Sequence, residues 1–231
     1  MKLSIYDSIG KFMANELETA LLGYPRPYLT DIELNTLLKG TPDSRYGKVK
    51  RLLAQGKLLH IRRGLYCLTD KMGFLKMPHP FELAQHIYGP SYISLESALS
   101  FYKLIPETVY TITSATAKRS KEFQTPLGIF SYLHLPLENF YTGVELVTEN
   151  EYQFLVAKPW KAICDYVFCY KKDWTSLKPL LEGLRIDREN LPLLSREEIQ
   201  LLDEYYHQKR LSRFLKGLQK DKMFWLLQNG F

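Results

Sequence analysis

The sequence has few cysteines and no long hydrophobic run. Three cysteines in 231 residues, at positions 67, 164 and 169, cannot form the disulfide framework of a small secreted domain, so we expect them reduced and buried in a cytoplasmic protein. No apolar run approaches the roughly 20 residues that a membrane-spanning helix needs, and we expect no membrane contact. Residues 1–23 are apolar at helical spacing but interrupted by charges, which predicts an amphipathic helix and not a signal peptide.

Metal-binding and cofactor motifs are also scarce. The sequence has no glycine-rich phosphate loop, no internal repeat and no low-complexity segment. His79, Glu82 and His86 only loosely resemble a metal-ligand pattern, because the two histidines are seven residues apart and His79 is expected outside the helix. We therefore expect no metal and no cofactor.

The sequence gives only weak evidence for a group of catalytic residues. Ser94 and Glu96 could be a nucleophile with a base, but a helix N-cap followed by a first-turn acid explains both. Asp165, Glu96 and Asp173 do not show the spacing of a metal-dependent transferase. We expect the protein not to be an enzyme; the enzyme alternative would require an activity that depends on Asp165 or Glu96.

Positive charge is concentrated near the N-terminus. Residues 1–76 contain 13 Lys and Arg against 7 Asp and Glu, whereas residues 77–231 contain 18 of each kind. Within residues 41–63, seven cations face Asp43 alone, so this segment accounts for the whole net charge of +6. Such a segment fits a polyanionic partner. A solvated helix face without a ligand is the alternative that charge alone leaves open.

The N-terminal elements follow a recognisable order. The pattern predicts helices over residues 3–22, from 31 to Gly40 and from 42 to 55, then a hairpin of 58–61 and 65–68. A capping box of Thr30 and Glu33 begins the second helix, and Thr41 caps the third, which has Pro42 first. This order predicts a winged helix-turn-helix DNA-binding domain over residues 1–75.

The third helix would present its polar face to the DNA major groove. On a helical wheel Tyr46, Val49, Leu52 and Leu53 share one face, while Ser44, Gly47, Lys48, Arg51 and Gln55 lie opposite. Gly47 would let the backbone approach a phosphate or a base edge. Base contacts and phosphate contacts both remain open for these side chains. The candidate DNA-binding residues, with the hairpin tip included, are Ser44, Arg45, Tyr46, Lys48, Arg51, Gln55, Arg62 and Arg63.

The hairpin tip carries two adjacent arginines, Arg62 and Arg63, before Gly64. A tight turn does not need them, and like charges side by side repel. A wing that contacts phosphate or enters the minor groove explains both residues.

Residues 76–231 predict a second domain of mixed α/β type with a helical C-terminal end, so the whole chain is of the α+β class. We expect short helices from Pro80 and from Ser94 to Tyr102, and a helix from Pro159. The clearest strands are 108–113, 128–135 and 151–157, and residues 114–125 are predicted to be a polar connection. A further short helix is expected over residues 173–185, and Ser195 with Glu198 should begin a long helix through about 218.

The C-terminal segment is rich in cations. Its basic residues favour the negative end of a helix dipole, which explains them without a ligand. The alternative is a second surface for nucleic acid or for a protein partner. These residues are Lys209, Arg210, Arg213, Lys216, Lys220 and Lys222, against Asp221.

Five segments carry a resemblance to a known family. "RGLYCL", "PHPFELAQHIYGPSYISLESALSFYKLIPE", "TITSAT", "GIFSYLHL" and "AKPWKAICDYV" occur in this order within residues 25–170. In order and spacing they resemble the AbiEi antitoxins of type IV toxin–antitoxin systems. "YISLESAL" followed by "LIPE" is the most specific part. The sequence departs from the family pattern where Trp160 replaces an acid and Ile163 a leucine, which puts any contact of that acid in doubt.

The resemblance implies a biological role that the residues alone do not show. Family members bind inverted repeats of double-stranded DNA in their own promoter and repress the operon. Their functional partner is a nucleotidyltransferase-like toxin, neutralised without a stable complex, in the setting of abortive phage infection. The protein would act as a monomer or a dimer on DNA. An alternative from another class is a protein-interaction module that binds a toxin or other partner directly, with the winged helix not used on DNA.

Overall fold

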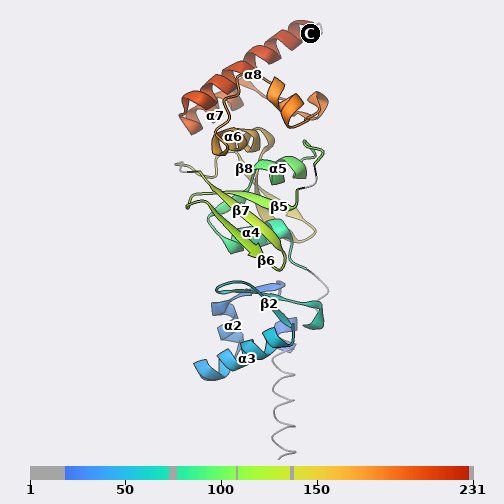
Figure 1. Cartoon of the computed structure of the whole chain (residues 1–231), viewed down its shortest axis with the longest axis vertical. Helices are drawn as coiled ribbons and strands as arrows, with labels where there is room; N and C mark the ends of the chain where they lie inside the picture. The colour runs from blue at the N-terminus through green and yellow to red at the C-terminus, as the bar shows by residue number, and fades with distance from the viewer. Residues whose placement is uncertain (1–18, 73–76, 108, 136–137, 229–231) are drawn as a thin grey trace, which may run out of the picture. The chain divides into compact units, whose positions relative to one another are not determined.

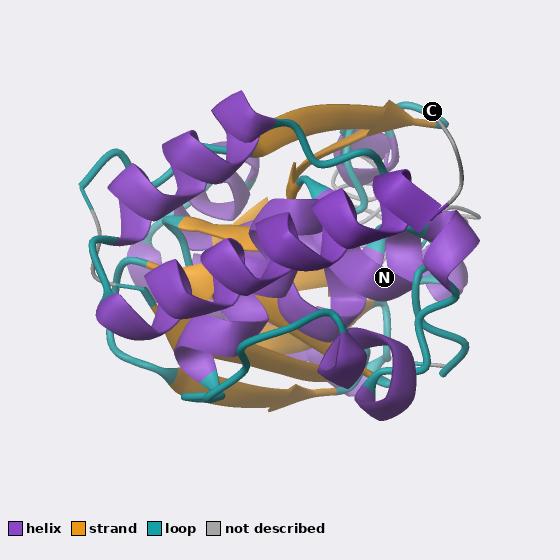
Figure 2. Ribbon diagram, turned by 90° about the horizontal axis from the view of Figure 1, so that it is seen from above, coloured by secondary structure: helices purple, strands orange, loops and turns teal. Residues whose placement is uncertain are grey.

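The computed structural model describes residues 19–72, 77–107, 109–135 and 138–228 (Figure 1). Helices and strands are mixed along the chain (Figure 2), as predicted for the α+β class. The chain divides into two compact units between Leu83 and Ala84, with residues 125–127 grouped with the first. Within the described ranges no helix combines the length and the apolarity that crossing a membrane would require.

The first unit contains a three-stranded antiparallel sheet in the order β1-β3-β2. Strand β1 was not predicted, because three residues are too few to show alternation and its extended form depends on pairing with β3. The predicted helix 3–22 lies mostly outside the described residues, which begin with helical residues 19–22. The elements of this unit are β1 (Tyr28–Thr30), α2 (Asp31–Leu37), α3 (Pro42–Ala54), β2 (Leu58–Arg62), β3 (Leu65–Leu68) and a 3₁₀ turn (Asp70–Met72).

Local signals place both helices of this unit. The capping box of Thr30 and Glu33 is present at the start of α2. The Thr41 hydroxyl accepts the Ser44 N–H at 3.4 Å, and Pro42 opens α3 as predicted. Helix α2 ends at Leu37 and not at Gly40, because Leu38 turns to an extended conformation. The predicted hairpin is confirmed, with one further residue in β2.

The core of the first unit lies between α2, α3 and the sheet. The helical wheel groups Tyr46 with Val49, Leu52 and Leu53, but its side chain is 71% exposed and takes no part in the core. The buried face is centred on Leu52, and Tyr46 projects about 120° away from it. The buried core residues are Leu21, Leu29, Leu34, Leu38, Leu52, Leu58 and Leu68.

The second unit is built on a six-stranded mixed sheet in the order β6-β7-β5-β4-β9-β8. Pairs β5–β7 and β4–β9 are parallel, while β4–β5 and β8–β9 are antiparallel. The predicted polar connection 114–125 is wrong, since it contains the end of β5 and all of β6. Strand β6 is an edge strand with largely exposed side chains, so it lacks the apolar alternation of a buried strand. The strands are β4 (Ser91–Ile93), β5 (Thr111–Thr116), β6 (Lys121–Thr125), β7 (Gly128–His134), β8 (Val144–Glu149) and β9 (Tyr152–Ala157).

The helices of the second unit agree with the sequence up to α6. The prediction of one long helix from Ser195 is wrong. Helix α7 ends at Tyr206, His207 adopts a left-handed conformation (φ 45°), and α8 begins at Lys209. The short helix expected at 173–185 is reduced to one π-helical turn. The unit boundary between Leu83 and Ala84 falls inside α4 (Pro80–Ile87). The other helical segments are α5 (Leu95–Phe101), α6 (Pro159–Cys169), π-turn η2 (Pro179–Gly183), 3₁₀ turn η3 (Arg188–Asn190), α7 (Arg196–Tyr206) and α8 (Lys209–Gln228).

The cysteines are free thiols, two of them buried. Cys67 and Cys164 are buried as predicted, whereas Cys169 is half-buried. Burial alone raises the pKa of the Cys67 thiol to about 12, so this side chain is a neutral core residue and not a reactive thiolate.

Candidate nucleic-acid interface

Helix α3 exposes a broad polar face. Of the predicted contact residues on it, Ser44, Tyr46, Arg51 and Gln55 are exposed to solvent. Lys50 is exposed as well. Lys50 is one of the seven cations of residues 41–63 but is not among the predicted contacts. It lies one turn after Tyr46 on the same side of the helix.

Arg45 and Lys48 are half-buried and hold the turn before α3. The Arg45 Nε–H donates to the Gly40 carbonyl at 2.9 Å, and Lys48 Nζ donates to the Lys39 carbonyl at 2.7 Å. Carbonyls just after a helix end lack helical partners, and nearby cations satisfy them. The two cations predicted as DNA contacts therefore also bind the carbonyl groups of the turn between α2 and α3. The remaining guanidinium N–H groups and ammonium protons of these side chains can still reach a second acceptor.

Gly47 lies at the centre of the exposed face of α3. A Cβ atom added there meets nothing within 4 Å, so no packing contact inside the protein requires glycine. Gly217 in α8 is different, because its added Cβ would lie 1.9 Å from the Thr175 carbonyl oxygen. Glycine inside a helix costs about 1 kcal/mol relative to alanine. At Gly217 the close backbone contact explains why the helix contains a glycine despite this cost. At Gly47 no contact within the protein explains it.

The hairpin tip is short and anchored to α2. Gly64 adopts φ 79°, and its carbonyl accepts the Asp31 N–H at 3.1 Å. Arg62 is half-buried and donates from Nη1 to the Arg63 carbonyl at 2.7 Å, while Arg63 is exposed. The two arginines therefore differ: Arg62 folds back onto the turn, and Arg63 extends into solvent.

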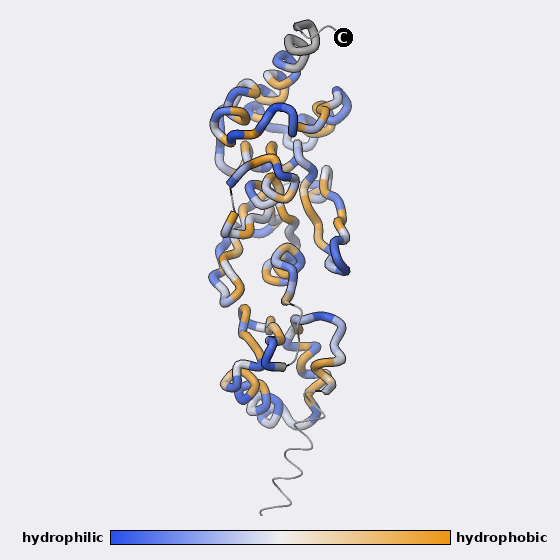
Figure 3. The backbone as a smooth tube through the Cα atoms, turned by 90° about the vertical axis from the view of Figure 1, so that its right-hand side faces the viewer, coloured by the Kyte–Doolittle hydropathy of each residue, from blue (hydrophilic) through white to orange (hydrophobic). Residues whose placement is uncertain are grey.

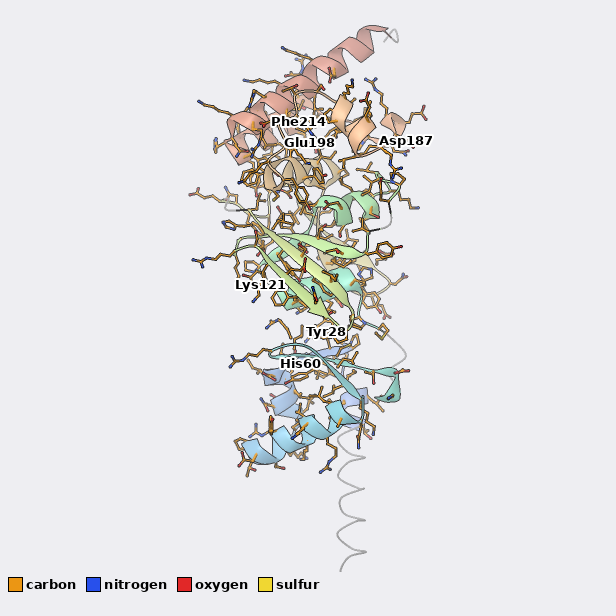
Figure 4. The ribbon with its side chains drawn as sticks, in the orientation of Figure 1. Tyr28, His60, Lys121, Asp187, Glu198 and Phe214 are labelled. Atoms are coloured by element: carbon orange, nitrogen blue, oxygen red, sulfur yellow. The ribbon has the colours of Figure 1, made fainter. Side chains whose placement is uncertain are left out.

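Two ring side chains pack across the hairpin. The His60 and Tyr66 rings lie 5.4 Å apart on β2 and β3, and His60 is exposed. Figure 4 labels His60. Burial raises the pKa of Tyr66, and the charge and hydrogen bond of Asp31 and the proximity of Tyr46 add to it. The ring pair itself joins β2 to β3, and the Tyr46 side chain on α3 is 71% exposed.

A second polar cluster is buried in the second unit. Lys161 and Asp165 on α6 are 1% and 0% exposed, and Lys161 Nζ lies 2.5 Å from Asp165 Oδ1. The Asp165 carboxylate also accepts hydrogen bonds from three hydroxyl groups. These donors are Tyr92 (3.0 Å), Ser94 (2.7 Å) and Tyr206 (2.5 Å).

Three tyrosine rings surround the Lys161 ammonium. Nζ lies 5.0, 4.8 and 5.2 Å from the ring centroids of Tyr92, Tyr205 and Tyr206. Burial lowers the pKa of Lys161, and the neighbouring Asp165 charge opposes this shift. Burial and Asp165 together raise the pKa of Tyr206 well above its usual value.

This cluster is closed to substrates. The Ser94 hydroxyl, which was considered as a nucleophile and as a helix cap, makes no capping bond and donates to Asp165 from a fully buried position. Glu96 lies elsewhere, where it accepts the Tyr170 hydroxyl at 3.2 Å. The proposed pairing of Ser94 with Glu96 is therefore not formed. The geometry is that of a structural ion pair that joins β4, α6 and α7.

Possible metal ligands do not gather in the described part of the chain. No group of three or more His, Cys, Asp and Glu side chains there is arranged to hold a metal ion. His79 instead accepts the Phe81 N–H at 3.3 Å through Nδ1, which places it at the start of α4.

Comparison with protein-family models and with curated proteins finds no match for this chain. The assignment of a function thus depends on the geometry described above and on the sequence resemblance.

Proposed function

We propose that the first unit is a winged helix-turn-helix domain that binds double-stranded DNA, with α3 in the major groove. The observation that carries this proposal is the exposed face of α3, which combines cations and hydrogen-bonding side chains around a glycine. The element order β1-α2-α3-β2-β3, with β3 central in the sheet, supports it. In such domains the second helix of the pair enters the groove and the hairpin lies beside it.

The structure favours a subset of the predicted contacts for base reading. Arg51 and Gln55 are exposed and have the groups that pair with guanine and adenine edges. Lys50 and Arg63 would contact phosphate. Arg45, Lys48 and Arg62, which already bind backbone carbonyls, would contribute positive charge close to the phosphates.

The biological role that best fits the sequence is an antitoxin that represses its own operon. This part of the proposal depends on the resemblance to the AbiEi family. In that role the first unit would bind inverted repeats in the promoter, and the second unit would counteract a nucleotidyltransferase-like toxin. Lys161 and Asp165 lie within the segment "AKPWKAICDYV" that carries the resemblance, and here they form a buried pair that stabilises the fold of that unit.

The direct test is DNA binding by a triple variant, Arg51→Gln with Arg62→Gln and Arg63→Gln. Fluorescence anisotropy would measure affinity for the promoter region of the protein's own gene at several salt concentrations. We expect weaker binding and a shallower salt dependence, since each phosphate contact contributes about 0.9 to the slope. A matched control, Lys103→Gln with Lys158→Gln and Lys171→Gln, removes the same charge from exposed sites in the second unit. Equal binding by the triple variant and the wild type would contradict the proposal.

A protein-interaction module is the second candidate. The resemblance leaves this candidate open, and the single exposed apolar side chain of Ile32 at the start of α2 (80% exposed) does not by itself mark an interface. A chain lacking residues 1–75 that still neutralises a toxin, together with a full chain that never binds the promoter, would favour this candidate over DNA binding.

A further inference from the structure

Helix α8 carries a straight row of exposed cations. Lys209, Arg213, Lys216 and Lys220 are all exposed, and their spacing of four, three and four residues places them within about 60° of one another around the helix. We name these four residues the α8 stripe. They extend over about 16 Å, at 1.5 Å per residue.

The opposite face of α8 is apolar and buried. Leu211, Phe214, Leu215 and Leu218 are at most 3% exposed, and Phe214 is labelled in Figure 4. Hydrophobic and hydrophilic residues are interleaved along this helix in Figure 3. The rotation of α8 is therefore fixed by its core contacts, and the α8 stripe is held towards solvent.

The helix dipole does not explain the α8 stripe. In one long helix these cations would lie towards the negative C-terminal end. Because helix α7 ends at Tyr206 and His207 turns to a left-handed conformation, α8 is a separate helix that begins with Lys209 and Arg210. Its first turn has no acid and its last turn has no cation. This distribution is the reverse of the one that stabilises a helix.

Nearby acids offset part of the positive charge of the α8 stripe. In the described residues, its one ion pair joins Arg213 and Asp173 at 3.7 Å, and both side chains are more than 60% exposed. The Asp203 carboxylate accepts the Ser212 hydroxyl, and the Asp221 carboxylate accepts the Leu177 N–H at 2.7 Å. Both carboxylates keep their charge, because their donors are neutral. Asp203 and Glu204 line one pocket together with Lys209, Arg213 and Lys216, so they offset part of the positive charge at this end of the stripe. The cationic groups of the stripe nevertheless remain exposed to solvent.

We infer that the α8 stripe binds a nucleic-acid phosphate backbone, as a second contact surface independent of the first unit. Protein interfaces are built around an apolar core and are poor in lysine. The residues between the cations on this face are small or polar, as at Ser212 and Gln219, and three of the four cations are lysines. Evenly spaced cations without an apolar centre instead suit a line of phosphates, which they contact without reading sequence.

The test compares two fourfold variants of the full chain. The stripe variant replaces Lys209, Arg213, Lys216 and Lys220 with Gln. The control variant makes the same change at four exposed lysines elsewhere in the second unit and removes an equal charge. Those control positions are Lys103, Lys158, Lys171 and Lys178. Thermal unfolding followed by circular dichroism checks that both variants fold.

Binding is measured by anisotropy between 50 and 200 mM salt, with a 20-base-pair DNA of arbitrary sequence and with an RNA hairpin. We expect the stripe variant to lower the salt slope by at least about 2, because each phosphate contact contributes about 0.9, and the control to leave it unchanged. A loss on DNA only, on RNA only or on both supports the inference and identifies the ligand. Unchanged binding by the stripe variant, an equal loss in the control, or no binding by the wild type overturns it.

The same measurements in the background of Arg51→Gln, Arg62→Gln and Arg63→Gln separate the two surfaces. If those three changes alone leave binding intact and the stripe variant still loses it, the proposed role of the first unit fails and the inference stands. If the stripe variant binds normally while the triple variant does not, the inference fails and the proposed function stands.

Discussion

At the scale of single residues, a substitution at Gly47 should change stability and DNA affinity in opposite directions. The side chain that glycine lacks would meet no atom of the protein. We expect Gly47→Ala to raise the free energy of unfolding of the first unit by about 0.5–1 kcal/mol through helix propensity, and to weaken DNA binding because the methyl group obstructs close approach. Thermal unfolding and anisotropy measure the two effects.

A control for this prediction lies on the same face of α3. Ala54→Gly should lower the free energy of unfolding by up to about 1 kcal/mol and leave the affinity unchanged. If Gly47→Ala stabilises the protein and binds DNA as tightly as the wild type, the close approach of this helix to DNA is refuted.

Glu33 makes the first unit sensitive to acid. Burial opposes its charge, but hydrogen bonds from the Thr30 backbone, from Tyr24 and from the Thr30 hydroxyl, together with the charge of Arg26, lower its pKa to about 2. The pKa in the unfolded chain is near the ordinary value of about 4.3. A lowered pKa stabilises the fold above pH 4.3, and this stabilisation is lost as the pH falls towards 2.

Glu33→Gln tests this pH dependence, because glutamine can still complete the capping box. We expect the variant to be less stable than the wild type at pH 6 and the difference to vanish near pH 2. Urea unfolding of the first unit across this range provides the measurement. A difference that is the same at both pH values would rule out the ionised carboxylate as the cause.

At the scale of elements, the Lys161–Asp165 pair joins α6 to β4 and α7. Lys161→Met should destabilise the second unit by about 3–5 kcal/mol, because it leaves a buried carboxylate without its cation. The double variant Lys161→Met with Asp165→Leu should recover part of this loss, since no isolated charge then remains. Urea unfolding distinguishes the three proteins. Lys158→Met is a control, because Lys158 precedes the same helix and its side chain is exposed. It should change the free energy of unfolding by less than about 0.5 kcal/mol.

Elements with strong local signals could be predicted from the sequence, and the others depend on tertiary contacts. Thr41 and Pro42 mark the start of α3 by their own chemistry. Strand β6 has no such signal, because an edge strand needs few buried side chains. The break at His207 occurs without glycine or proline, between the buried side chains of Tyr206 and Phe214, so no residue type at the break marks it in the sequence.

In the candidate interface, too, features set by local sequence could be predicted, and features set by tertiary contacts could not. The wheel correctly predicted that Arg51 and Gln55 are exposed, because their distance from the apolar positions is a local property. It could not predict that Arg45 and Lys48 bind carbonyls after α2, since this depends on where α2 ends in space. The wheel groups Tyr46 with the apolar residues, but the apolar character of an aromatic ring does not decide its burial.

At the scale of the whole molecule, the two units have separate cores and should respond separately to core damage. Leu34→Ala in the first unit and Leu99→Ala in the second remove buried side chains, and each should cost about 2–5 kcal/mol. We expect calorimetry to show two transitions, of which each variant shifts one. A single transition that moves equally in both variants would mean that the units unfold together.

The partners of Asp165 have a consequence for synthesis on the ribosome. Its carboxylate is hydrogen-bonded to Tyr92 and Ser94, more than 70 residues before it, and to Tyr206, 41 residues after it. The last of these partners exists only when residue 206 has been translated and has left the exit tunnel. The sheet of the first unit is complete once Leu68 has emerged. A nascent chain can therefore complete the sheet of the first unit before the second unit has the tyrosine that completes its buried ion-pair cluster.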